Sequence, residues 1–302
     1  MKYIKNLASN YPARENPIEL DIVIEGGAFN GLYITGCMLL LKELERKNYL
    51  KVNRISGVSI GSVLGYYYFT NKSKQMINDF DYMRKTYKER SNCSGVSDLC
   101  EKLKVTKSDI KKINNKLFIT YTKNGIKETV SIYKSVEDLK KYLLVSCQIP
   151  YLTSNTFFRK IEDDNYLDGG TPFIFNNRCV DDKKILHLNT LWNFTKILNI
   201  SKEKNSSSRI LEGALQLHKF LMYNDKVPLC SYINDWNMYD YTVIRIRNLI
   251  VRVSFYFLWF LKTNYNIVKP YMQIYLFDIH SYNEIHNIIK EFVKDMILLN
   301  CF

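Results

Sequence analysis

An alternation of short apolar runs and helical patterns in the first 70 residues constrains the fold more than any other feature. Leu20 to Ile24 and Val52 to Ile55 are short apolar runs rich in β-branched residues, and each is followed by glycine within two residues. Residues 32–49 and 60–69 carry apolar side chains at helical spacing. A strand, a helix and a second strand in this order form a crossover unit with parallel strands. The sequence therefore predicts an α/β fold with a mainly parallel central sheet flanked by helices.

The rest of the chain continues this mixture of strands and helices. Residues 72–116 form a polar, basic and helical stretch. Two alternating runs around Asn124-Gly125 predict a hairpin, because Asn-Gly favours a two-residue turn. Ser135 is a helix N-cap with Asp138 three residues later. Further strands are expected at 157–161 and 185–188, and further helices at 210–223, 244–262 and 281–299.

The composition is globular, with an unusual excess of positive charge. Hydrophobic residues make up 46% of the 302 residues, too many for a disordered protein. There are 43 basic and 30 acidic residues, a formal net charge of +13. Such a charge suits nucleic acid, an anionic membrane or solubility alone. No nucleic-acid-binding module is recognisable, so nucleic acid is not an expected partner.

Cysteine usage and apolar run length indicate a cytoplasmic protein, at most peripheral at membranes. The seven cysteines show no C-x-x-C pair, which predicts reduced thiols and no readable metal site. The N-terminus lacks the apolar region of a signal peptide. The longest apolar stretch, residues 249–261, is broken by Arg252 and is too short for a transmembrane segment.

A G-x-S-x-G sequence, Gly57-Val58-Ser59-Ile60-Gly61, stands where the second strand meets a helix. On such a sharp turn the serine hydroxyl points out of the sheet, and glycines allow the tight backbone. An oxyanion there would be stabilised by the positive end of the helix dipole. The pattern alone is common, and an inert turn is the alternative; its strand–helix context favours Ser59 as a nucleophile.

The glycine-rich sequence Gly26-Gly27-Ala28-Phe29-Asn30-Gly31 directly follows the first strand. One interpretation is a dinucleotide fingerprint, but the second strand ends in Ile55-Ser56 without the acidic residue that it requires. A second is a tight turn without a role. A third, which we favour, is an oxyanion hole for Ser59, because adjacent parallel strands bring both loops to one sheet edge.

A third motif, Asp168-Gly169-Gly170, follows Asn165-Tyr166-Leu167. By itself it is a common loop in which the aspartate caps a turn. Its significance comes from its position after the other two motifs.

In this order and spacing the three motifs resemble the patatin-like phospholipase family. Its members carry a G-G-x-x-x-G loop, then G-x-S-x-G, then D-G-G or D-G-A. The segment from Ser146 to Pro150 also resembles the family's S-x-x-x-P sequence. The resemblance covers residues 20 to about 180.

The resemblance implies a patatin-like three-layer fold with a helical C-terminal extension. Residues 20–182 would form the catalytic core, with the basic helical insertion at about 72–116, and residues 183–302 would complete the fold, mostly with helices. The implied activity is that of a lipid acyl hydrolase, a phospholipase A-type esterase acting through a covalent acyl-serine. Its substrate would be a phospholipid or another acyl lipid, and it would need no cofactor or metal.

The same resemblance assigns roles to individual residues. Ser59 would be the nucleophile and Asp168 its general base, without a histidine. Backbone N–H groups would form the oxyanion hole at Gly26, Gly27 and Ala28. The supporting glycines of the motifs would be Gly31, Gly57, Gly61, Gly169 and Gly170.

Two departures from the family pattern keep alternatives open. Ala28 replaces the usual third glycine and Asn30 the usual basic residue. They allow a catalytically silent membrane-binding or interaction protein on the same fold. All four histidines follow Asp168, so a Ser–His–Asp hydrolase is a further alternative. We expect His187, in an alternating strand-like run, to be a core or edge residue instead. The histidines are His187, His218, His280 and His286.

Much of the positive charge falls between the serine and aspartate motifs. Residues 84–127 contain 12 basic and four acidic residues, a net charge of +8. Basic residues beside an anionic membrane gain roughly 1 kcal/mol each. The stretch is either a membrane-facing surface or an ordinary solvated helical face.

Overall fold

The computed structural model describes most of the first 263 residues, and the chain divides into two compact units. The units are Met1–Trp236 and Asn237–Phe302. The described residues are 2–90, 94–150, 152–154, 156–175, 183–197 and 206–263.

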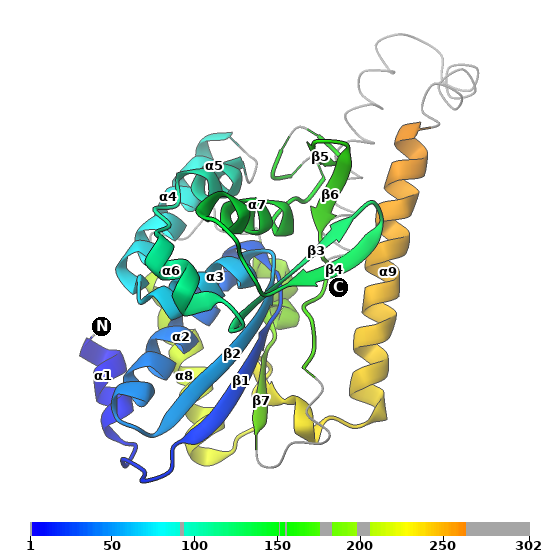
Figure 1. Ribbon diagram of the computed structural model, residues 1–302. Helices are drawn as coiled ribbons and strands as arrows, with labels where there is room; N and C mark the ends of the chain where they lie inside the picture. The colour runs from blue at the N-terminus through cyan, green and yellow to red at the C-terminus, as the bar shows by residue number, and fades with distance from the viewer. Residues whose placement is uncertain are drawn as a thin grey trace. The chain divides into compact units, whose positions relative to one another are not determined.

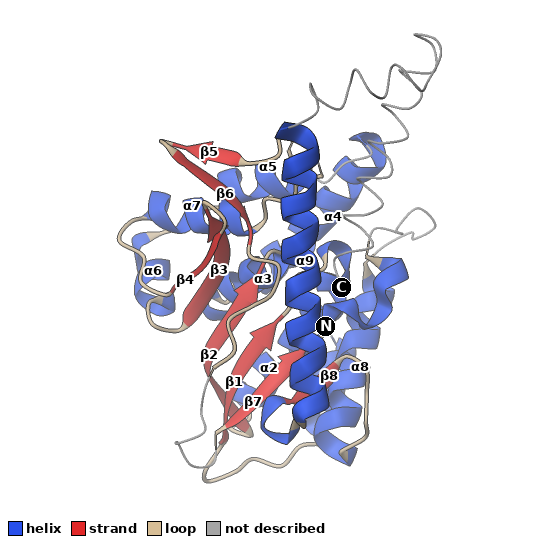
Figure 2. Cartoon of the chain, turned by 90° about the vertical axis from the view of Figure 1, so that its right-hand side faces the viewer, coloured by secondary structure: helices blue, strands red, loops and turns tan. Residues whose placement is uncertain are grey.

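An eight-stranded mixed sheet forms the centre of the first unit (Figure 1). Its strands are β1 (Ile18–Ile24), β2 (Leu50–Val58), β3 (Leu117–Lys123), β4 (Ile126–Val130), β5 (Arg159–Ile161), β6 (Asp164–Asp168), β7 (Lys184–Leu188) and β8 (Cys230–Tyr232). The strand order is β5-β6-β3-β2-β1-β7-β8, and β4 pairs with β3. The central strands β7, β1, β2 and β3 are parallel (Figure 2), whereas β4, β5, β6 and β8 pair in antiparallel fashion.

Helices pack against this sheet and against one another. The helices of the first unit are α1 (Lys2–Ser9), α2 (Gly31–Arg46), α3 (Ile60–Thr70), α4 (Ser73–Arg90), α5 (Ser94–Lys102), α6 (Lys107–Ile113), α7 (Val136–Ser146) and α8 (Ser207–Tyr223). Short 3-10 helices are η1 (Ala28–Asn30), η2 (Thr190–Lys196) and η3 (Ile233–Asp235). Helices α2 and α3 contact β2, α7 contacts β3, and α8 packs along α2. The predicted α/β class with a central sheet and packed helices is confirmed.

The strand–helix alternation of the first 70 residues folds as its sequence predicts. Strand β1 and helices α2 and α3 match the expected segments within a few residues. Strand β2 is longer than predicted, because it continues through Gly57 to Val58. The parallel register pairs Ile24 with Gly57, so the loops that follow β1 and β2 begin side by side. This register places the glycine loop beside the serine motif.

Later segments agree with the sequence in most places. The Asn124-Gly125 turn joins β3 to β4, and Ser135 caps α7 by accepting a hydrogen bond from the N–H of Asp138. The basic stretch at 72–116 folds into α4, α5 and α6. Strand β6 was not predicted, because its sequence Asp-Asn-Tyr-Leu-Asp carries polar residues at both ends.

The described part of the second unit is the single helix α9 (Met238–Thr263), which covers the helix expected at 244–262. The helix expected at 281–299 lies outside the described residues. Among the described helices, none combines the length and apolar character needed to cross a bilayer.

Candidate active site

Ser59 occupies a strained turn between β2 and α3. Its backbone φ of 54° lies in a region that non-glycine residues seldom adopt, and its side chain is buried. The flanking glycines leave no room for side chains. A Cβ on Gly57 would lie 2.5 Å from the carbonyl carbon of Gly61, and one on Gly61 would lie 2.8 Å from the Ile24 oxygen. Close packing of β1, β2 and α3 therefore explains both glycines of the G-x-S-x-G motif.

The backbone of Ser59 is anchored from the next part of the sheet. Its N–H donates to Oγ of Ser146 at 2.9 Å, and the Ser146 hydroxyl donates to the Thr120 oxygen at 2.8 Å. Ser62 Oγ donates to the Ser59 oxygen at 2.6 Å. These bonds use the N–H and C=O of Ser59 and leave its hydroxyl available for chemistry.

Asp168 ends strand β6 and is also buried. Its N–H donates to the Gln148 oxygen at 2.8 Å, which ties the aspartate to the loop after α7. Its Oδ1 accepts the N–H of Gly170 at 2.7 Å. A Cβ on Gly169 would lie 2.8 Å from the backbone of Thr120, so glycine is needed there for close approach to β3. The Asp-Gly-Gly motif therefore binds Oδ1 of the carboxylate through the Gly170 N–H and does not bind Oδ2.

The electrostatics of Asp168 suit a general base near neutral pH. Burial raises the pKa of Asp168 to about 6, while the Gly170 N–H, the Ser59 hydroxyl and the Lys127 charge act in the opposite direction. Oδ2 of Asp168 has no hydrogen-bond partner of ordinary geometry among the described residues. The Ser59 hydroxyl is thus close enough to affect the carboxylate without a formed hydrogen bond, and such contacts often tighten only when substrate binds.

The glycine loop directly adjoins the serine. A Cβ on Gly26 would lie only 3.0 Å from the Cβ of Ser59. Gly27 has a φ of 154°, and a Cβ there would lie 2.6 Å from Oγ1 of Thr190. Ala28 follows with a φ of 41°, a left-handed conformation in which glycine would be unstrained. The third glycine of the family pattern thus corresponds to a position where the backbone favours glycine, and Ala28 adopts the conformation nonetheless.

Within the described residues, the backbone N–H groups of the glycine loop fall into two sets: those that donate to backbone oxygens and those that donate to none. The N–H of Phe29 donates to the Ile197 oxygen at 3.2 Å, and that of Asn30 donates to the Gly27 oxygen at 2.9 Å. The N–H groups of Gly26, Gly27 and Ala28 donate to no acceptor in the described ranges. If Ser59 acts as a nucleophile, unused amides beside it are what an oxyanion hole requires.

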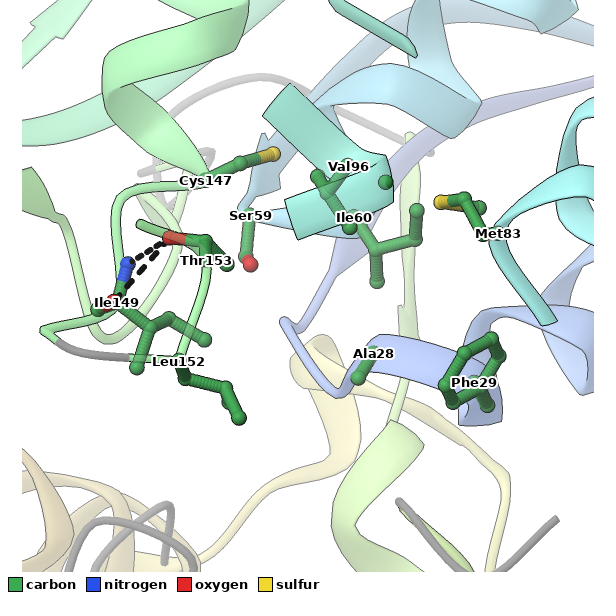
Figure 3. A pocket seen from close by; sticks show the side chains of 11 residues that line it. Ala28, Phe29, Ser59, Ile60, Met83, Val96, Cys147, Ile149, Leu152 and Thr153 are labelled. Carbon is green, nitrogen blue, oxygen red and sulfur yellow. Dashed lines mark hydrogen bonds between the residues drawn. The ribbon is translucent and has the colours of Figure 1, made fainter. Parts of the chain in front are cut away.

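A small apolar pocket opens at Ser59 (Figure 3). It is lined by Ala28, Phe29, Ser59, Ile60, Met83, Gly95, Val96, Cys147, Ile149, Leu152 and Thr153. The lining comes from the glycine loop, the start of α3, helices α4 and α5, and the loop after α7. Its cavity of about 20 Å³ has room for about one water molecule.

The remaining predicted glycine, Gly31, lies at the start of α2 rather than against the serine hydroxyl. A Cβ at this position would lie 2.8 Å from Cζ of Phe80 and 2.9 Å from Cγ1 of Ile60. Gly31 therefore allows α2 to pack closely on α3 and α4.

The two described histidines have partners away from Ser59 and Asp168. His187 contacts Glu25 at 3.1 Å through Nε2 and packs edge-on against Trp236, so it is a core residue as predicted. His218 contacts the hydroxyl of Tyr11 at 3.0 Å through Nδ1. His280 and His286 lie outside the described residues. Within the described part of the chain no group of acidic, histidine or cysteine side chains is arranged to hold a metal ion.

Several residues that shape the site carry no role that the sequence predicts. Thr190 Oγ1 donates to the Gly26 oxygen, and the side chain of Asn30 is held by η2 and α8. Ser146 supports the serine, and Lys127 acts on the aspartate. These contacts join segments far apart in the sequence, so the motifs that contain Asn30 and Ser146 do not give their partners.

Comparison of the sequence with models of known protein families and with curated proteins finds no match.

Proposed function

We propose that this protein is a serine lipid acyl hydrolase of patatin type, with Ser59 as nucleophile and Asp168 as general base. The observation that carries the proposal is the convergence of the two residues from different strands. The Ser59 hydroxyl lowers the pKa of a buried carboxylate, and unused amides of the glycine loop lie beside it. Nucleophile, base and oxyanion donors are the three parts that acyl transfer needs.

The proposed reaction proceeds in two halves. Ser59 Oγ attacks the ester carbonyl carbon while its proton passes to Asp168, and loop N–H groups stabilise the oxyanion, worth roughly 3–4 kcal/mol per donor. The bond to the alcohol breaks, and the alcohol leaves with the proton from Asp168. Asp168 then takes a proton from water, whose oxygen attacks the acyl-serine and releases the acid. Asp168 returns that proton to Ser59.

The pocket lining favours an acyl chain as the group held beside the serine. Phe29, Ile60, Met83, Val96 and Leu152 are apolar and surround the nucleophile. Because the cavity holds only about one water molecule, a long chain requires the lining segments to move apart.

An anionic membrane surface is the proposed docking partner. Between residues 102 and 116 six lysines are exposed: Lys102, Lys104, Lys107, Lys111, Lys112 and Lys116. Asp109, the one acidic residue in that stretch, is buried and paired with Lys72 at 2.7 Å. The exposed surface of α6 and its flanks is therefore cationic and attracts anionic lipid headgroups.

A catalytically silent protein that binds membranes through the same surface is the second candidate. The small cavity and the left-handed Ala28 favour it, because both make a productive acyl complex harder to form.

A fluorophosphonate probe separates the two candidates. Stoichiometric labelling of the native protein, absent in Ser59→Ala, supports the hydrolase. Folded protein that resists labelling supports the silent candidate. Lipid product profiling with wild type and Ser59→Ala then identifies the substrate.

Vesicle co-sedimentation tests the membrane partner. We expect binding to anionic but not neutral vesicles, weakened by salt and by Lys107→Glu with Lys111→Glu. Equal binding of this variant would exclude the α6 surface.

A further inference from the structure

Arg209 is a buried cation that reaches the glycine loop from α8. Only 2% of its surface is exposed, and its guanidinium lies 5.5 Å from the ring centre of Tyr33. Nη1 donates to Oδ1 of Asn30 at 3.0 Å and to the Lys196 oxygen at 2.8 Å. Burying a guanidinium is unfavourable unless hydrogen bonds replace its hydration. These contacts therefore fix both Arg209 and the groups that it binds.

Asn30 connects Arg209 to the segment that covers the loop. The Asn30 side chain is fully buried, and its Nδ2 donates to the Thr190 oxygen at 2.7 Å and the Asn193 oxygen at 2.9 Å. The guanidinium can only donate, so it requires the amide oxygen of Asn30 to face it. The amide nitrogen must then face η2. Arg209 thereby selects one orientation of Asn30 and locks the start of α2 against η2.

The backbone of Asn30 in turn orients a peptide unit of the proposed oxyanion hole. The Asn30 N–H donates to the Gly27 oxygen at 2.9 Å. The Gly27 C=O and the Ala28 N–H belong to one planar trans peptide, so they point in opposite directions. Fixing the carbonyl therefore fixes the direction of the unused Ala28 N–H.

Thr190 acts in the same way on the preceding peptide. Its Oγ1 donates to the Gly26 oxygen, which shares a peptide plane with the unused N–H of Gly27. The backbone oxygen of Thr190 also accepts a hydrogen bond from the Asn30 side chain. Both peptide planes therefore depend on the same contacts among Arg209, Asn30 and Thr190, which we call the clamp.

We propose that Arg209 is a positioning residue of the candidate active site, which acts through Asn30 to aim the Gly27 and Ala28 amides at the oxyanion. The inference rests on the proposed hydrolase function. It also accounts for Asn30 at a loop position where the family pattern has a basic residue: here the cation comes from α8.

The test compares Arg209→Met with Tyr11→Phe. Arg209→Met removes the donors but keeps a long apolar side chain. Tyr11→Phe removes a buried hydroxyl that contacts His218 on the same helix, away from the loop. Activity on a soluble ester is expressed per active site, titrated with fluorophosphonate.

For Arg209→Met we expect kcat to fall about 10- to 100-fold with KM changed less than about threefold, because misaimed amides weaken oxyanion binding selectively. Arg209→Lys should recover part of kcat. Thr190→Val should also lower kcat without disturbing a buried charge. Wild-type kcat in both Arg209→Met and Thr190→Val, or equal loss in Tyr11→Phe, overturns the proposal.

Hydrogen exchange separates this proposal from the hydrolase function. If the wild type neither labels nor hydrolyses esters, the proposed function fails and the clamp can still be measured. The Asn30 amide should then exchange faster in Arg209→Met than in Tyr11→Phe. Equal exchange in the two variants would exclude Arg209 as the residue that orders the loop.

Discussion

The backbone N–H of Ser59 donates to the hydroxyl of Ser146 at 2.9 Å, across 87 residues of sequence. The Ser146 hydroxyl in turn donates a hydrogen bond to the Thr120 oxygen at 2.8 Å. The strained turn that carries the proposed nucleophile is therefore held from β3 and the end of α7 as well as by its own glycines.

Ser146→Ala should loosen this turn. The buried N–H of Ser59 and the Thr120 oxygen both lose a partner, which costs about 2 kcal/mol in the free energy of unfolding. We expect kcat to fall because the serine hydroxyl is no longer held in one position. Urea unfolding and ester hydrolysis measure the two effects. The control is Thr70→Val, which removes a buried hydroxyl at the other end of α3 and should leave kcat unchanged.

Asp168→Asn should abolish hydrolysis yet stabilise the protein at neutral pH. Burial raises the pKa of Asp168 to about 6, so the folded state holds a disfavoured carboxylate above that pH. Compared with an unperturbed aspartate, this destabilises the fold by roughly 2–3 kcal/mol at pH 7. The penalty shrinks as pH falls from about 6 to about 4, and it is lost only at pH values below about 4, where the carboxyl is protonated in both states. Denaturant unfolding of the wild type and of Asp168→Asn, at about pH 7 and about pH 4, checks this prediction. If Asp168→Asn is less stable than the wild type at neutral pH, the prediction is contradicted.

Lys127 should displace the acid limb of the pH–rate profile. As a base, Asp168 must be ionised, so kcat/KM should fall as pH drops through about 6. Lys127 lowers the pKa of Asp168, and Lys127→Met should therefore shift this limb to higher pH. Lys123→Met is the matched control, since Lys123 belongs to the same hairpin but pairs with Asp164 at 2.7 Å. Identical shifts in the two variants would exclude a specific action of Lys127.

Gly27 and Ala28 should differ in their tolerance of substitution: alanine at position 27 is expected to be harmful, whereas glycine at position 28 is expected to be tolerated. Gly27→Ala places a Cβ against Oγ1 of Thr190 at a backbone conformation with positive φ. We expect the free energy of unfolding to fall by about 1–3 kcal/mol and most of the activity to be lost. Ala28→Gly relieves the φ of 41° and should retain both stability and activity. Thermal unfolding and fluorophosphonate labelling of the two variants test this. Loss of labelling in Ala28→Gly would mean that the Ala28 methyl group itself is needed.

Local patterns in the sequence predicted much of the fold. The run from Leu20 to Ile24 and the helical spacing after it produce β1 and α2, and Asn124-Gly125 produces a hairpin. These elements are specified by residues close together in the chain. The strand that ends at Asp168 was missed because its polar ends hide the alternation, and pairing with β3 determines it instead.

The candidate site was predicted only where backbone geometry demands particular residues. Gly57 and Gly61 are needed because neighbouring backbone would clash with a Cβ, so the motif is visible in the sequence. Arg209 and Ser146 each form hydrogen bonds to distant segments, and many residue types could make such bonds at many positions. Their partners become known only once the chain has folded.

The order of these segments along the chain matters during synthesis. Ser59 and the glycine loop emerge from the ribosome early, whereas Asp168, Thr190 and Arg209 emerge more than about 100 residues after Ser59. A growing chain that ends near residue 150 contains β1, β2 and β3, but it holds neither the proposed base nor the residues proposed to order the glycine loop. Vectorial synthesis thus delays the assembly of the candidate site until most of the first unit is made, and truncated products carry Ser59 without the groups proposed to activate it.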